Sequence, residues 1–203
     1  MCRIASYLHK KGCTVYGTSR KPKNTNKSTF QLIALDVLNS ESIEKAVASI
    51  LDKEGRLDVL VNNAGMGITG PVEDTPTNEM RKVFETNFFG AIDMMKAVMP
   101  QMRKQQSGTI INITSIAGYM GLPYRGVYSA TKGALDLVSE AARMEVKEFG
   151  IQIATIAPGD VATNIAAGRY HTPVFENSAY KEKYQMNLDL MDSHVDSGMN
   201  PTK

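Results

Sequence analysis

Residues 57–65 read LDVLVNNAG, a short apolar run followed at once by two asparagines, an alanine and a glycine. The run has the length and the nearly continuous hydrophobicity of a β-strand that is buried on both faces. The small and polar residues after it favour a turn in which the backbone comes close to a ligand. Four further runs are similarly rich in valine, isoleucine and threonine: Cys13 to Ser19, Phe30 to Val37, Gly108 to Ser115 and Ile151 to Pro158.

Between the predicted strands, apolar residues recur every three or four positions, which is typical of helices. We expect one helix from Glu41 to Lys53, with Asn39 or Ser40 as its N-cap. A longer helix is expected to begin with Thr75 as N-cap and Pro76 at its first position. Further helices are predicted at Arg3 to Lys11, Gly126 to Phe149 and Ala179 to Leu190. The alternation predicts an α/β protein with a parallel sheet covered by helices, in a single domain over residues 1–203.

The chain of 203 residues is nearly neutral, with 23 Lys and Arg against 21 Asp and Glu and a net charge of +2. This balance argues against nucleic acid as a partner. No apolar run approaches the roughly 18–20 residues that cross a bilayer, so we expect no membrane partner. The two cysteines are too few for a disulfide framework or a zinc site. We therefore expect a cytoplasmic protein without a metal.

The segment Tyr128-Ser129-Ala130-Thr131-Lys132 opens one predicted helix. Residues four apart lie one above the other on a helix, so the ammonium of Lys132 can approach the phenol of Tyr128. A phenol has a pKa near 10, and a nearby cation lowers that pKa by about 1–3 units. Such a pair can act as general acid and base near neutral pH. The spacing alone is common, so its weight depends on the other motifs.

Those other motifs follow one another in a fixed order along the chain. They are Asn62-Asn63-Ala64-Gly65 after a strand, Asn87 in the long helix, Ser115 at a strand end, Tyr128-x-x-x-Lys132, and Pro158-Gly159 followed by Thr163. Together they resemble the short-chain dehydrogenase/reductase (SDR) family, over about Arg3 to Thr163. The resemblance implies a doubly wound, Rossmann-like sheet flanked by helices, and hydride transfer with a nicotinamide cofactor.

The same resemblance implies a catalytic set of four residues. Tyr128 exchanges a proton with the substrate oxygen, while Lys132 binds the nicotinamide ribose and lowers the pKa of the phenol. Ser115 hydrogen-bonds the substrate carbonyl or alcohol. The main chain of Asn87 holds a water in a proton relay, although a satisfied buried amide is the alternative reading. Further cofactor contacts are implied at Asp36, Val37, Asn63, Ala64, Gly65, Pro158, Gly159, Val161 and Thr163.

Cofactor choice depends on the end of the second family strand. NAD-specific folds place a carboxylate there for the ribose 2′-hydroxyl, whereas this chain reads Thr18-Ser19-Arg20-Lys21. A guanidinium and a hydroxyl can both bind a phosphate. Ser19 and Arg20 therefore favour NADP over NAD, with a merely solvated basic loop as the alternative.

The chain departs from the family at both ends. The first strand and its Gly-rich, phosphate-binding turn should stand just before Cys2 and are missing. Cys13 to Ser19 and Leu57 to Asn63 would then each lack their shared central neighbour. After Thr163 we expect a segment that covers the substrate, up to about Leu190, but no further strand. The predicted domain is therefore incomplete, and an exposed sheet edge allows pairing with a second copy of the chain.

Two functions follow from these observations. In the first, the protein is an NADP-dependent oxidoreductase that interconverts a small carbonyl compound and a secondary alcohol. In the second, it is a non-catalytic fragment or a binding protein on the same scaffold. The retained Asn87, Ser115, Tyr128 and Lys132 favour the first, and the missing glycines favour the second.

Overall fold

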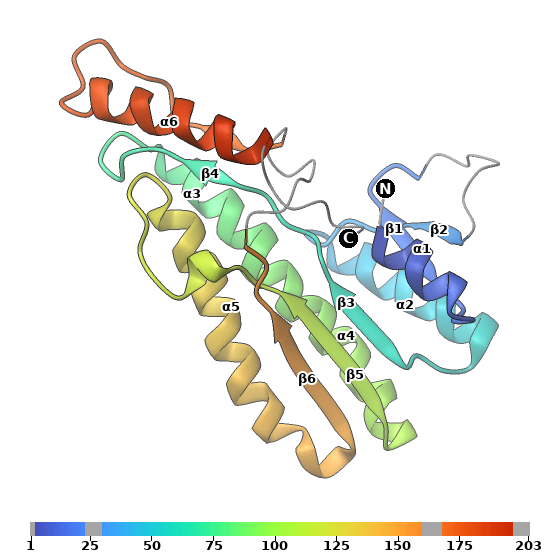
Figure 1. The fold of residues 1–203 in the computed structure, drawn as a ribbon. Coiled ribbons are helices and arrows are strands. Elements are labelled where there is room, and N and C mark those ends of the chain that lie inside the picture. The colour runs from blue at the N-terminus through green and yellow to red at the C-terminus, as the bar shows by residue number, and fades with distance from the viewer. Residues whose placement is uncertain (1–2, 23–29, 160–167, 197–203) are drawn as a thin grey trace.

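The computed structural model describes residues 3–22, 30–159 and 168–196. Its largest sheet is parallel, has the strand order β3-β5-β6, and consists of β3 (Val59–Asn62), β5 (Gly108–Ile113) and β6 (Ile151–Ile156). A second parallel pair joins β1 (Tyr16–Ser19) to β2 (Gln31–Ala34). All five strands lie within the runs predicted from the sequence, and the α/β architecture is confirmed (Figure 1).

The two sheets are not joined to each other. Within the described ranges, β1 is hydrogen-bonded only to β2, and β3 only to β5. One edge of β1 and one edge of β3 therefore lack a partner strand in this part of the chain. This is the geometry expected if both strands are deprived of a shared central neighbour.

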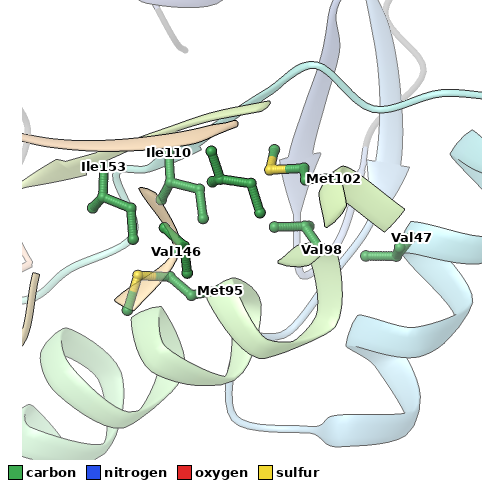
Figure 2. Close-up of a cluster of buried hydrophobic side chains, with 8 residues drawn as sticks. Val47, Met95, Val98, Met102, Ile110, Val146 and Ile153 are labelled. Atoms are coloured by element: carbon green, nitrogen blue, oxygen red, sulfur yellow. The ribbon is translucent and has the colours of Figure 1, made fainter. Parts of the chain in front are cut away.

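Three of the helices, α2, α4 and α5, pack against strands of the two sheets. Their bounds are α1 (Arg3–Lys10), α2 (Ser40–Glu54), α3 (Thr77–Phe84), α4 (Gly90–Gln105), α5 (Gly126–Glu145) and α6 (Lys181–Asp196). Helices α2, α4 and α5 share one apolar core with β5 and β6 (Figure 2). Its centre joins Ile110 and Ile153 of the sheet to Val98 and Met102 of α4, and Ile110, Val98 and Met102 are fully buried.

The helix ends show where sequence reasoning succeeded and failed. Asn39 caps α2, because its side-chain oxygen accepts a hydrogen bond from the Ser42 nitrogen at 2.8 Å. The predicted Thr75 cap is wrong, since Pro76 occupies the cap position of α3. The Thr75 hydroxyl is used elsewhere and donates to the Pro71 carbonyl at 2.6 Å.

The long helix predicted after Pro76 is interrupted. One turn of π-helix, η1 (Glu85–Phe89), separates α3 from α4 and contains Asn87. The third predicted helix likewise divides into α5 and a short 3-10 turn, η3 (Lys147–Phe149). It ends at Gly150, which has a φ of 69°. Of these two interruptions, the π-helical turn η1 is the unusual one, because π-helical turns are rare in helices and often occur at functional sites.

A small third sheet was not predicted. Strand β4 (Ile68–Thr69) pairs in parallel with β7 (Tyr170–His171), so the expectation of no strand after Thr163 was wrong. A pair of two-residue strands is too short to give an alternating pattern in the sequence. Helix α6 lies beside β4 (Figure 1). The buried Tyr184 hydroxyl fastens it there, because it donates to the Thr69 carbonyl at 2.9 Å.

Candidate active site

Asn87 lies at the centre of the predicted site and is almost completely buried, with 1% of its surface exposed. Its amide nitrogen donates to the Met66 carbonyl at 2.9 Å and to the Thr131 hydroxyl at 3.1 Å. Its amide oxygen accepts from the Met66 nitrogen at 2.8 Å. The side chain thus fastens the turn that follows β3 to helix α5. The satisfied-amide reading is correct for this side chain, and the relay through its main chain stays a prediction.

Thr131 extends this connection toward Tyr128. Its hydroxyl donates to the Tyr128 carbonyl at 2.8 Å while it accepts the bond from Asn87. Sequence reasoning missed Thr131, although it stands next to Lys132 in the quoted motif. A hydroxyl one residue before the lysine was the only signal, and the sequence did not show which partners it would meet.

Gly65 brings the turn after β3 against the same residues. A Cβ placed on Gly65 would lie 3.3 Å from the Asn87 side-chain oxygen and 3.7 Å from the Lys132 nitrogen. A side chain at this position would therefore press on the Asn87 oxygen and touch the ammonium group. Three residues from separate predicted motifs, Gly65, Asn87 and Lys132, thus meet in space.

Lys132 is buried, with 4% of its surface exposed, and its ammonium donates to the Ile113 carbonyl at 2.7 Å. The nitrogen lies 6.0 Å from the centroid of the Tyr128 ring, as expected for residues four apart on a helix. Burial lowers the pKa of Lys132 from 10.5 to about 8, because the charged form loses its hydration. The group is thus charged at neutral pH and close to titrating.

Ser115 follows β5 and opens a short 3-10 turn, η2 (Ile116–Gly118), in which its hydroxyl accepts a bond from the Ala117 nitrogen at 3.2 Å. The Ile116 nitrogen donates to the Pro158 carbonyl at 3.2 Å, so the ends of β5 and β6 are adjacent here.

Two glycines dock this turn onto helix α5. A Cβ on Gly118 would lie 2.9 Å from the Gly133 nitrogen, and a Cβ on Gly133 would lie 2.8 Å from the Gly118 carbonyl oxygen. Only glycines permit so close an approach of two backbones. The turn after Ser115 is therefore held against the helix that carries Tyr128 and Lys132.

A small cleft opens beside Tyr128. Among the described residues, its lining consists of Gly67, Ile68, Arg125, Tyr128 and Arg169. The guanidinium carbon of Arg125 lies 6.0 Å from the centroid of the Tyr128 ring, a distance compatible with a cation–π contact. Sequence reasoning missed both arginines. Arg125 could have been found, because it precedes Tyr128 by three positions and so shares its side of the first helical turn.

The remaining predicted cofactor residues are more scattered. Ser19 and Arg20 are exposed at the end of β1, in the other sheet, where the Ser19 hydroxyl accepts from the Lys21 nitrogen at 3.4 Å. Asn63 and Ala64 are exposed after β3. Gly159, like Pro158, lies next to Ile116, whose side chain would be 3.5 Å from a Cβ placed there. Val161 and Thr163 lie outside the described residues.

The two residues predicted at the adenine both make contacts within the protein. Asp36 accepts a bond from the Leu38 nitrogen at 3.0 Å through its carboxylate. Val37 packs closely on Gly90 at the start of α4, since a Cβ on that glycine would lie 2.9 Å from a Val37 methyl group. Both side chains are half-buried. Their predicted role at the adenine remains open to test.

Known proteins are similar to this chain over most of its length. The profile of the short chain dehydrogenase family matches residues 2–173. The chain is 42% identical over 200 residues to a 3-ketodihydrosphingosine reductase of Bacteroides thetaiotaomicron, covering 98% of this chain and 74% of that protein. Among the residues that the structure describes, no helix is long and apolar enough to cross a membrane.

Solved structures are similar in fold. A short-chain dehydrogenase from Streptomyces avermitilis superposes with a TM-score of 0.84 at 37% identity, covering 94% of this chain and 72% of that one. ElxO with NADP bound gives 0.74 at 30% identity, covering 93% and 73%. An NAD+-bound xylitol dehydrogenase gives 0.64 at 33% identity, covering 66% and 52%. Both nicotinamide cofactors thus occur among the similar structures.

Proposed function

The chain belongs to the short-chain dehydrogenase/reductase family of NAD(P)-dependent oxidoreductases, and we propose that it interconverts a carbonyl compound and a secondary alcohol with NADP as cofactor. The observation that carries the proposal is the buried Lys132, which lies beside the Tyr128 ring and, like Asn87, next to Gly65. A buried ammonium is costly, and such groups occur preferentially where their charge is used.

The residues around Lys132 suit a nicotinamide ribose. An ammonium has three N–H donors, and one of them binds the Ile113 carbonyl. The others can bind the ribose hydroxyls, in the space that Gly65 leaves beside the ammonium. The cofactor, when bound, supplies or takes up the hydride at the substrate carbon.

Tyr128 performs the proton transfer that accompanies this hydride. In the reducing direction its phenol gives a proton to the carbonyl oxygen, which becomes the alcohol hydroxyl. The nearby ammonium of Lys132 stabilises the phenolate that remains. The Ser115 hydroxyl orients the substrate oxygen. Asn87 and Thr131 hold the main chain of these elements in place through the bonds described above.

The preference for NADP rests on residues of this chain, because the similar structures include both cofactors. Ser19 and Arg20 are exposed at the end of β1 and can donate hydrogen bonds to a 2′-phosphate. Where NAD-specific folds place a carboxylate for the ribose hydroxyl, this chain has the sequence Thr-Ser-Arg-Lys.

The test is the oxidation of NADPH by the protein with a panel of ketones, including 3-ketodihydrosphingosine, the ketone in the name of its bacterial relative. Tyr128→Phe should lower kcat by about 10²–10⁴-fold and leave NADPH affinity nearly unchanged, because only the proton-transferring oxygen is removed. Turnover by Tyr128→Phe within a few-fold of the parent would show that Tyr128 is not the acid. Cofactor binding without turnover of any ketone or alcohol would favour a non-catalytic binding protein.

A further inference from the structure

Thr131 is fully buried in helix α5, between Tyr128 and Lys132 in the sequence. Its hydroxyl donates to the Tyr128 carbonyl at 2.8 Å and accepts a bond from the Asn87 amide nitrogen at 3.1 Å. A hydroxyl has a single hydrogen to donate, so the direction of one of these bonds settles the direction of the other.

Met66 fixes the direction of the whole chain of bonds. The Asn87 side-chain oxygen accepts from the Met66 nitrogen, and the Asn87 amide nitrogen donates to the Met66 carbonyl. Turning the amide over would place two donors face to face at one end and two acceptors at the other. The second amide hydrogen therefore faces Thr131, whose own hydrogen is left for Tyr128. The turn after β3 thus determines, through two side chains, a bond to the backbone of Tyr128.

The π-helical turn η1 presents Asn87 to helix α5. Its cap residue Gly90 donates its backbone N–H to the Glu85 carbonyl, five residues earlier, and η1 packs against α5. Turns of this width are rare in helices and are frequent at functional sites. Here the wide turn holds the side chain that bonds to Thr131.

Other contacts hold the same helix from a different side. The Lys132 ammonium donates to the Ile113 carbonyl of β5, and Ser139 accepts a bond from Asn112 of the same strand. Thr131 instead joins α5 to η1 and to the turn after β3, in which Gly65 lies beside the Lys132 nitrogen. Tyr128 is therefore fixed relative to the turn where we place the nicotinamide ribose.

We propose that Thr131 is a positioning residue, whose hydroxyl joins Tyr128 to the turn after β3 and so holds the phenol where it can protonate the substrate oxygen. Proton transfer requires the two heavy atoms to lie about 2.6–3.2 Å apart. A displacement of about 1 Å that originates outside the reacting groups can lower the rate by about 10²-fold. The inference rests on the proposed oxidoreductase function, because it concerns how the same Tyr128 is held.

The test begins with Thr131→Val, which keeps the shape of the side chain and removes the hydroxyl. With NADPH and the ketone that the parent reduces fastest, kcat should fall by about tenfold to a hundredfold. The KM for the ketone and the dissociation constant of NADPH should stay close to the parent values, because neither ligand loses a contact. Thr131→Ser keeps the hydroxyl and should restore most of kcat.

Ser139→Ala is the matched control. The Ser139 hydroxyl is also buried in α5, donates to the Leu135 carbonyl at 2.6 Å and accepts from the Asn112 amide at 2.7 Å. It lies about 12 Å farther along the helix than Thr131, at 1.5 Å per residue. Ser139→Ala should lower the stability to urea, as Thr131→Val does, and leave kcat unchanged. A similar loss of kcat in both variants would assign the effect to general damage and overturn the proposal.

A measurement without turnover separates this inference from the proposed function. Protein labelled with ¹³C at the tyrosine Cζ gives nuclear magnetic resonance signals from its eight tyrosines, and Tyr128→Phe identifies the signal of Tyr128. Thr131→Val should shift that signal, Thr131→Ser should restore it, and Ser139→Ala should leave it in place. These results in a protein that reduces no ketone would support the positioning role and reject the oxidoreductase.

Three results would overturn the role of Thr131. They are a kcat for Thr131→Val within a few-fold of the parent, a Tyr128 signal that does not move, and a failure of Thr131→Ser to restore either. If the valine variant does not fold, Thr131→Ala allows the same comparisons, because alanine favours the helix more than valine does.

Discussion

Replacing Lys132 with methionine should change how the stability of the protein depends on pH. Methionine has a similar length and no charge, so it removes the cost of burying the ammonium. A pKa that falls from 10.5 to about 8 corresponds to about 3 kcal/mol of that cost at neutral pH, on a side chain that is 4% exposed. The bond from Lys132 to the Ile113 carbonyl is also lost, at a cost of about 1–3 kcal/mol. We therefore expect Lys132→Met to be as stable as the parent at pH 7, or up to about 2 kcal/mol more stable.

The sign of the pH dependence follows from proton binding. The unfolded chain keeps the lysine proton up to about pH 10.5, whereas the folded protein releases it near pH 8. Between these values the unfolded state binds more protons, so the stability of the parent rises with pH. The variant lacks this group, so its stability does not rise with pH for this reason. Between pH 7 and pH 10 the parent should therefore gain about 2–3 kcal/mol relative to Lys132→Met.

The assay is urea unfolding at pH 7, 8, 9 and 10, followed by far-ultraviolet circular dichroism because the chain contains no tryptophan. Lys104→Met, at an exposed position in α4, is the control for removing any lysine. The difference in unfolding free energy between the two variants isolates the effect of burial. If that difference is the same at pH 7 and pH 10, the ammonium of Lys132 is not desolvated and the reasoning fails.

Three further predictions concern other parts of the fold. Arg20→Ala should weaken NADPH binding by about 1.5–3 kcal/mol and NADH binding much less, as measured by titration calorimetry, and equal losses would make Arg20 a bystander. Asn87→Ala should lower the unfolding free energy by about 2–4 kcal/mol, because the main-chain groups of Met66 lose their partners inside the protein. A loss below about 1 kcal/mol in urea unfolding would contradict this prediction. Gly133→Ala should lower the unfolding free energy by about 1–3 kcal/mol and reduce turnover, since its Cβ would meet the Gly118 carbonyl oxygen at 2.8 Å. A variant with the melting temperature of the parent would refute the contact.

The elements of the fold were largely predictable because their signals are local. The run LDVLVNN predicts β3, and helical spacing predicts α2 with a cap at Asn39 or Ser40, of which Asn39 is the cap in the structure. The i, i+4 spacing of Tyr128 and Lys132 likewise brings the ammonium and the ring together through helix geometry alone. The break between the sheets also follows the sequence, which offers no strand to lie between β1 and β3 within the described part of the chain.

Other features were decided only by the tertiary structure. The Thr75 hydroxyl, which the sequence predicts as a cap, instead lies 2.9 Å from the Thr172 hydroxyl, 97 positions away, and β4 and β7 formed between segments about a hundred residues apart. Asn87 meets Thr131 across 44 positions. Each of these outcomes depends on contacts between distant segments, and a side chain carries no local record of which distant partner it will meet. Periodicity and spacing therefore determined the helices, the strands of the two larger sheets and the Tyr128–Lys132 pair, whereas packing decided which backbone groups hold that pair.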